Sequence, residues 1–438
     1  MTTSHPFDRA FSRLVDEDEE HGYRDLPEEV RDEVPGNAGK QVLAQSLQKV
    51  GDLIVDPKTV LSWLMAAVGA PAGLVGLLVP IREAGSMLPQ AALVPYVRRL
   101  AVRKWVWVAG GLLQAVAVVA MALATASLQG LAAGVAILAA LAVLAVARSL
   151  SSIASKDVLG RTVPKGARGR VNGWATIGGG VAAITVGLAM RGFGGQQTGT
   201  ATFAWLLLGG AVAWLLAVLV YARVVEAPGV ADGAQGRAAG GALRLLRSDA
   251  TFRRFVVARA LLLVSALTPP FVVALATASG ADTGLRGLGP FVISSGIAAL
   301  IGGQVWGRMA DRSSRRVMML AAGGASAIVL AFLALLRVEA VAELEWLYAG
   351  TYLLLALAHH GARIGRKTYV VDIAEGDRRT EYVAVSNSAM GVLLLAAGAV
   401  SAAAATVGVE LALALLAALG LTGVLVSRSL PETDATRR

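Results

Sequence analysis

Long apolar runs separated by short charged segments recur along the sequence, and they constrain the fold more than any other feature. Many runs exceed about eighteen residues with few charges, which is the signature of a transmembrane helix. They lack the alternation of barrel strands, and a helix satisfies its own backbone hydrogen bonds in lipid. We therefore expect an all-α membrane protein with twelve transmembrane helices in a lipid bilayer. The predicted spans are residues 42–68, 72–97, 104–126, 130–156, 171–191, 200–223, 252–277, 287–308, 316–337, 345–370, 381–405 and 409–427.

Composition supports a membrane location and excludes several classes of function. Of the 438 residues, 55% are hydrophobic and 16% are charged, whereas a soluble domain carries about 25% charged residues. The chain has no cysteine, which excludes disulfides, thiol catalysis and cysteine-based metal sites. It contains no H-E-x-x-H zinc motif and no phosphate-binding motif of ATP-driven pumps. We therefore expect a non-enzymatic protein with no metal, no cofactor and no nucleic-acid partner.

Basic residues are distributed unevenly between the two sides of the predicted membrane. Segments on one side hold 27 of the 40 lysines and arginines, and loops on the other side hold three. Because cytoplasmic loops carry the excess of basic residues, we expect a cytoplasmic-membrane protein with both termini in the cytoplasm. Residues 1–41 form an acidic tail that we interpret as solvated and mostly disordered, particularly at Asp16 to Glu20. A regulatory or partner-binding tail is the alternative.

The two halves of the sequence resemble each other weakly. A shift of 212 residues aligns 79–111 with 291–323 and also places Pro57 on Pro269. A shift of 211 residues aligns 141–172 with 352–383. We therefore divide the chain into an N-terminal six-helix half (42–223), a flexible linker (224–251), a C-terminal six-helix half (252–427) and a tail (428–438). Parallel repeats of this kind are a transporter architecture, with the solute site between the halves.

The loop after the eighth predicted span reads GRMADRSSRR. It resembles the cytoplasmic signature loop of the major facilitator superfamily, G-x-x-x-D-R-x-x-R-R. The matching positions are Gly307, Asp311, Arg312, Arg315 and Arg316. The equivalent residues 95–104 of the first half keep only the basic end of the motif. The resemblance implies a secondary transporter whose cavity is lined by helices 1, 4, 7 and 10.

The signature loop has the chemistry of a cytoplasmic gate. A glycine allows helices to approach closely. Asp311 is expected to cap a neighbouring helix or to pair with an arginine in one access state only. The alternative is a set of basic residues that merely fixes the topology.

An arginine and a glutamate, Arg82 and Glu83, stand side by side inside the second predicted span. They lie thirteen and twelve residues from Pro95 at the cytoplasmic end, and thirteen residues of helix span about 20 Å. The hydrocarbon layer is about 30 Å thick, so both residues are expected within the membrane. A charge exposed to lipid at that depth costs about 2.5 kcal/mol or more. We therefore expect the pair to face the protein interior or a watery cavity.

The first predicted span carries a polar face formed by Gln45, Lys49, Asp52 and Asp56. Their spacing of four, three and four residues places them on one side of a helix. An alternative is a span that starts at Thr59, with the preceding residues in an amphipathic lead-in.

Two further spans carry isolated polar groups. Arg148 lies on the fourth span, and His359 lies on the tenth, where it is either a buried neutral histidine or a proton carrier. Arg363, Arg366 and Lys367 follow on the tenth span, and we interpret them as snorkelling to the cytoplasmic surface.

The leading hypothesis is a secondary transporter that moves a small organic solute by alternating access. The predicted pathway consists of Lys49, Asp52, Asp56, Arg82, Glu83, Arg148 and His359. Coupling to protons is a further hypothesis, which rests on the three carboxylates of that set. A membrane-embedded enzyme with Mg²⁺ at Asp52 and Asp56 is disfavoured, because no second acidic cluster faces them. A non-transporting assembly factor or sensor on the same fold is the remaining alternative.

Overall fold

The computed structural model describes residues 26–164, 167–193, 195, 199–228, 245–279, 285–373 and 378–432, which contain helices and no strand. The acidic run at 16–20, most of the predicted linker 224–251 and the end of the 428–438 tail lie outside the described residues.

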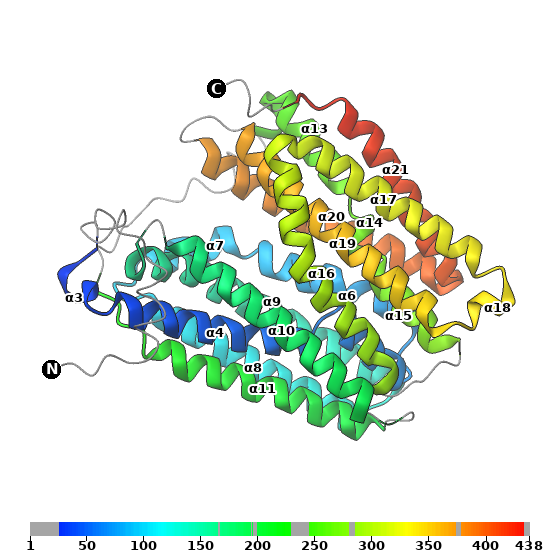
Figure 1. Ribbon diagram of the computed structural model, residues 1–438, viewed down its shortest axis with the longest axis horizontal. Helices are drawn as coiled ribbons and strands as arrows, with labels where there is room; N and C mark the ends of the chain where they lie inside the picture. Colours follow the sequence, from blue (N-terminus) through cyan, green and yellow to red (C-terminus); the bar gives the residue numbers. More distant parts are fainter. Residues whose placement is uncertain are drawn as a thin grey trace.

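The helices of the described residues follow one another along the chain as Figure 1 shows. Their bounds are α3 (Glu28–Arg31), α4 (Val34–Ile54), α5 (Val60–Ala67), α6 (Ala72–Met87), α7 (Gln90–Arg98), α8 (Lys104–Ser127), α9 (Gly130–Thr162), α10 (Arg168–Phe193), α11 (Thr200–Ala222), α13 (Ala250–Leu261), α14 (Val264–Leu267), α15 (Pro269–Ala278), α16 (Leu285–Arg312), α17 (Ser314–Leu335), α18 (Glu339–Ala342), α19 (Glu345–Asp372), α20 (Arg378–Val407) and α21 (Val409–Arg428).

Within the described chain, nine helical stretches are long and apolar enough to cross a membrane. One of them, Ala250–Ala278, runs through α13, α14 and α15. Three predicted spans, 42–68, 72–97 and 345–370, have no counterpart among the nine. The chain is therefore a helical, multi-pass membrane protein, and the twelve-span layout stays a prediction.

The first predicted span is interrupted in the structure. Helix α4 begins at Val34, eight residues earlier than expected, and ends at Ile54, and α5 begins only at Val60. Pro57 lies in the gap and has no N–H to donate to a continuing helix. The Asp56 carboxylate instead accepts the backbone N–H groups of Lys58 at 2.8 Å and Thr59 at 3.1 Å. Asp56 therefore occupies a turn, and its predicted place on one continuous helical face is wrong.

The helices pack in two groups whose internal contacts repeat. In the first group, α8 packs on α9 and α11, α6 on α9, and α4 on α10 and α11. In the second group, α17 packs on α19 and α21, α16 on α19, and α13 on α20 and α21. Figure 1 shows the groups as two bundles that diverge at the left of the view and meet towards the lower right.

Among the helix pairs that join the groups, α10 with α16 and α6 with α20 make the most extensive contacts. Glycines allow the backbones to approach closely at both pairs. A Cβ placed on Gly289 would lie 2.7 Å from the Gly187 carbonyl oxygen across the α10–α16 contact. At the α6–α20 contact, a Cβ on Gly398 would lie 2.0 Å from the Pro80 ring. These contacts leave no room for a side chain.

We expect Gly289→Ala to lower the free energy of unfolding by about 1–3 kcal/mol, because the added methyl group meets fixed backbone rather than a movable side chain. Gly303→Ala, on the same helix, is the matched control, since a Cβ there meets nothing within 4 Å. Thermal unfolding of the purified variants measures the difference. Equal melting temperatures for the two variants would contradict a tight α10–α16 contact.

Candidate functional site

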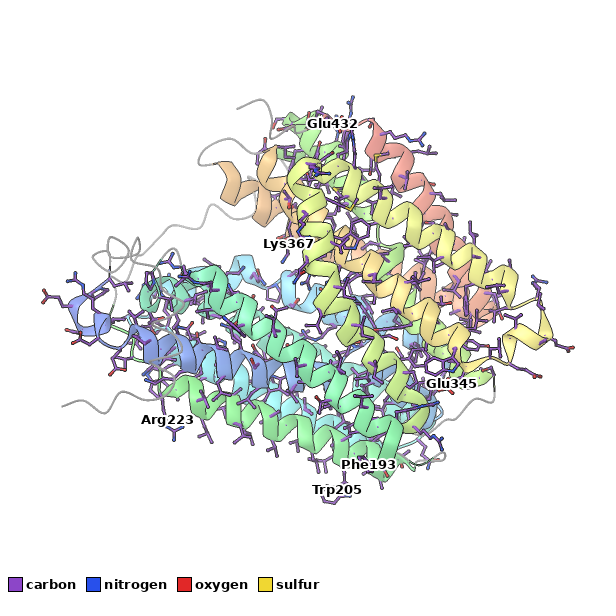
Figure 2. All side chains as sticks on the ribbon, in the orientation of Figure 1. Phe193, Trp205, Arg223, Glu345, Lys367 and Glu432 are labelled. Carbon is purple, nitrogen blue, oxygen red and sulfur yellow. The ribbon has the colours of Figure 1, made fainter. Side chains whose placement is uncertain are left out.

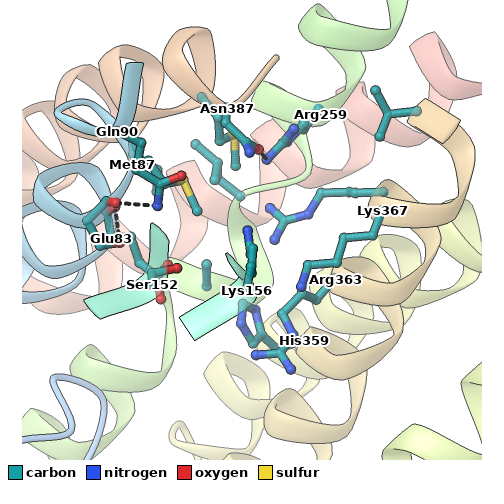
Figure 3. A pocket seen from close by; sticks show the side chains of 17 residues that line it. Glu83, Met87, Gln90, Ser152, Lys156, Arg259, His359, Arg363, Lys367 and Asn387 are labelled. Atoms are coloured by element: carbon teal, nitrogen blue, oxygen red, sulfur yellow. Dashed lines mark hydrogen bonds between the residues drawn. The ribbon is translucent and has the colours of Figure 1, made fainter. Parts of the chain in front are cut away.

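Two adjoining cavities lie between the two helix groups. Their volumes are about 440 Å³ and about 320 Å³. The first group contributes residues of α6 and α9, and the second group contributes residues of α13, α19 and α20 (Figure 3). The residues that line both cavities are Glu83, Ser86, Gln90, Ser152 and Arg363.

The Asp52 carboxylate is the centre of an ion-pair network in the smaller cavity. Arg82 from α6 contacts one of its oxygens at 3.0 Å, and Arg148 from α9 contacts the other at 2.8 Å. All three side chains are less than one third exposed. Arg82 thus pairs with Asp52 on another helix. Three helices are joined by this network, because Asp52 belongs to α4.

The two remaining cavity carboxylates differ in their surroundings. Asp56 bonds to the backbone turn before α5 and also accepts the Thr59 hydroxyl at 3.1 Å. Glu83 lies beside Gln90 and Ser152 at the cavity wall (Figure 3). Within the described part of the chain, its carboxylate forms no hydrogen bond and no ion pair. Glu83 therefore faces the cavity without a direct bond, and its charge acts on the nearby Lys58 and Arg366 through space.

Six of the seven predicted pathway residues line one of the two cavities, and Lys49 lines neither. The Lys49 ammonium donates to the Thr176 hydroxyl of α10 at 2.9 Å, so its contribution is to helix packing. His359 lines the larger cavity, with Nδ1 3.5 Å from the Ser265 hydroxyl. The His359 ring is half-buried at this polar part of the cavity wall.

The cavities also contain basic residues that the predicted pathway omits. We call Lys58, Lys156, Arg259, Arg363, Arg366 and Lys367 the basic cluster. Arg363 and Lys367 are exposed as expected for surface residues, but the space that they face is the cavity (Figure 3). Arg259 follows Arg253 and Arg254 in the predicted span 252–277, and because these lie at the basic cytoplasmic end, the sequence carries no separate signal for Arg259.

The signature loop is held by the end of the chain. Arg315 and Arg316, in the first turn of α17, each contact the Glu432 carboxylate at 2.9 Å. Desolvation raises the pKa of Glu432, but Arg315, the Ser313 hydroxyl and Arg316 together lower it below its ordinary value. Gly307 and Arg312 lie on α16, and the side chain of Asp311 lies outside the described part of the structure. In the described structure, the signature loop is therefore bound by Glu432, which follows α21.

The first half contains an equivalent contact. Buried Glu226, just after α11, accepts the backbone N–H groups of Arg103 at 3.1 Å and Lys104 at 2.7 Å, where α8 begins. Arg103 and Lys104 align with Arg315 and Arg316 at the repeat shift of 212. Sequence analysis did not identify either glutamate, although each lies within two residues of a proline after the last span of its half.

An ion pair joins the two helix groups at the opposite end of α19. Arg191, near the end of α10, contacts Glu345, at the start of α19, at 2.6 Å. Lys367 lies twenty-two residues further along α19, which corresponds to about 33 Å. Figure 2 shows Glu345 and Lys367 well separated along this helix. The groups are therefore linked at one end of α19, and the larger cavity lies towards the other.

Comparison with known proteins supports this description of the fold. No protein-family model and no curated protein matches the sequence. The inward-open xylose transporter XylE from E. coli is 11% identical, with a TM-score of 0.67 over 92% of this chain and 97% of that chain. The nucleoside transporter NupG is 14% identical, with a TM-score of 0.62 over 89% and 98%. A POT family transporter bound to a thioalcohol-conjugated peptide is 9% identical, with a TM-score of 0.70 over 93% and 98%.

These likenesses define the fold. The chain has the fold of the major-facilitator-type transporters, as the signature loop at Gly307 to Arg316 predicted. At these identities the likeness concerns architecture, and the function is inferred from the site.

We expect Asp52→Asn to lower the free energy of unfolding by about 2 kcal/mol or more, because it leaves Arg82 and Arg148 without their shared anion. Glu83→Gln is the comparison variant and should lower stability less than Asp52→Asn, since in the described structure Glu83 forms no hydrogen bond or ion pair that the change would break. Thermal unfolding of Asp52→Asn, Arg82→Gln and the double variant measures the coupling between Asp52 and Arg82. A Glu83→Gln effect as large as that of Asp52→Asn would contradict the assigned network.

Proposed function

We propose that the protein is a secondary active transporter that moves a small organic solute across the cytoplasmic membrane by alternating access. In this proposal, twelve spans form two six-helix halves, 42–223 and 252–427, with both termini in the cytoplasm. The observation that carries it is the pair of charged cavities between two helix groups with repeated internal packing. The transporter titles of its structural neighbours add support.

The access state follows from the two ends of the molecule. Arg191 and Glu345 join the groups at the end that the distribution of basic residues assigns to the outside. The larger cavity is lined by Lys156 and Lys367, which belong to segments assigned to the cytoplasm. The described conformation is therefore the one open to the cytoplasm. Transport then requires the Arg191–Glu345 contact to open and the cytoplasmic end to close.

The signature residues Gly307, Asp311, Arg312, Arg315 and Arg316 form part of the cytoplasmic gate in this proposal. Glu432 and Glu226 each hold the loop of their own half. Such contacts keep each loop in a fixed shape while the halves move relative to one another.

A single cysteine at Ser86 tests alternating access, because the native chain has none and Ser86 lines both cavities. A membrane-impermeant maleimide should label Ser86→Cys rapidly from the cytoplasmic side and slowly from the outside. Adding Arg191→Ala removes an ion pair whose side chains are about one third exposed. If such a pair is worth about 1 kcal/mol, outside labelling should rise by about fivefold. Mass spectrometry of oriented vesicles measures both rates.

Two further positions control for vesicle orientation. Phe193 and Arg223 are exposed at opposite ends of the molecule (Figure 2). The variants Phe193→Cys and Arg223→Cys should therefore each be labelled from one side only. Labelling of Ser86→Cys from one side only, with and without Arg191→Ala, would favour the alternative of a non-transporting assembly factor or sensor.

Proton coupling is the finer part of the proposal, and Glu83 is its candidate carrier. Asp52 forms ion pairs with two arginines, and Asp56 accepts backbone N–H groups. Glu83 faces the cavity and forms no hydrogen bond or ion pair in the described structure. Protonation of Glu83 would neutralise the one carboxylate, among those that line the described cavities, that forms no hydrogen bond or ion pair.

We therefore expect the outside labelling rate of Ser86→Cys to change as the pH is lowered. Glu83→Gln in the same background should abolish that change, because it fixes the side chain in a neutral form. Asp56→Asn is the comparison variant, and labelling of Arg223→Cys corrects for the pH dependence of the reagent. A pH response that survives Glu83→Gln would exclude Glu83 as the carrier.

A further inference from the structure

The cavities hold a large excess of positive charge. Eight basic side chains line them, namely the basic cluster together with Arg82 and Arg148, against three carboxylates. Two of these carboxylates are already engaged, because Asp52 pairs with Arg82 and Arg148 and Asp56 bonds to backbone N–H groups. Glu83 alone remains to balance the six residues of the basic cluster.

Several guanidinium groups at the cavity wall have buried donors without an acceptor. In the described structure, Nη1 of Arg148, Nε of Arg259 and Nε of Arg366 are buried and form no hydrogen bond. Buried donors are almost always satisfied in folded proteins, so each such group requires an explanation. Arginine forms its strongest hydrogen bonds with carboxylate and phosphate groups. The missing acceptor is therefore best supplied by an anion.

Membrane topology does not account for Arg259. A snorkelling side chain carries its charge to water, whereas Arg259 is only 6% exposed. It lies nine residues after the start of α13, and its two terminal nitrogens bond to neutral groups, the Ser386 hydroxyl at 2.9 Å and the Asn387 carbonyl at 3.0 Å. No carboxylate of the described chain pairs with it. A charge held this way inside a membrane protein is expected to serve a ligand.

The larger cavity is apolar on part of its wall. Met87, Leu263, Met390 and Leu394 line it beside the charged groups. Small-molecule sites combine an apolar lining with a few polar groups that fix orientation, and the volume of about 440 Å³ suits a small solute.

We propose that the solute is an organic anion with more than one negative charge, borne by phosphate or by paired carboxylates. The basic cluster binds the charged part, and the apolar wall contacts the carbon skeleton. This inference rests on the proposed transport function and names its substrate class.

The test measures ligand-induced stabilisation of the purified full-length protein in a neutral detergent. The probes are matched pairs, glucose 6-phosphate with glucose, uridine monophosphate with uridine, and succinate with succinamide, together with inorganic phosphate. Ionic strength is held constant with potassium chloride, so that general screening does not differ between samples. We expect at least one organic anion to raise the melting temperature in a saturable way, and its neutral partner to have no effect.

The variants locate the binding site. Lys156→Gln/Lys367→Gln removes two exposed charges that form no hydrogen bond or ion pair in the described structure, so the fold should survive. We expect it to weaken anion binding by about tenfold, equivalent to about 1.4 kcal/mol. Arg254→Gln, on the exposed face of α13, is the matched control and should bind like the native protein. Equal weakening in Arg254→Gln would show non-specific attraction and overturn the proposal.

The remaining outcomes separate the two proposals. Stabilisation by the neutral partners and not by the anions overturns the anionic solute and leaves transport intact. A panel without any effect, together with one-sided labelling of Ser86→Cys, counts against both. A parallel arm compares phosphatidylglycerol with phosphatidylcholine. Stabilisation by phosphatidylglycerol alone assigns the cluster to a lipid headgroup and overturns the soluble solute.

Discussion

The cost of placing charge inside an apolar layer governs this structure. This cost applies to Asp52, Arg82 and Arg148. The three charged groups avoid lipid by pairing with one another at the cavity wall. Their shared ion pairs tie α4, α6 and α9 around one cavity wall. The same requirement acts on Asp56, whose carboxylate is satisfied by the turn that separates α4 from α5. Polar groups therefore determine where the apolar helices are interrupted.

The sequence was most informative where helices face lipid. Predicted spans such as 104–126 and 409–427 agree closely with α8 and α21, because an apolar run surrounded by lipid has no other stable conformation. Prediction was poorest at 42–68. There α4 begins at Val34, in a stretch whose buried residues pack against α9 and α10 rather than lipid, and it ends before Pro57. Hydropathy cannot locate boundaries that depend on neighbouring helices.

The candidate site was only partly predictable, for a different reason. Isolated charges such as Arg82 and Arg148 were identified because an apolar neighbourhood makes them conspicuous. Arg363, Arg366 and Lys367 lie near a cytoplasmic end, where basic residues are expected for topology alone. Sequence cannot separate a residue that sets orientation from one that lines a cavity at the same depth. The sequence could not show that Lys49 bonds to Thr176, since that contact depends on how α4 and α10 pack.

The arrangement of ion pairs favours movement of the two groups as units. The contacts of Glu226 and Glu432 each remain within one group, and the Asp52 network lies wholly within the first. Arg191–Glu345 crosses between the groups, with both side chains about one third exposed. The contact between α10 and α16 combines close backbone approach at Gly289 with side chains such as Leu300, which packs over Gly180. The ion-pair networks thus hold each group together, while the junction between the groups rests mainly on helix packing, which is compatible with movement of each group as a unit.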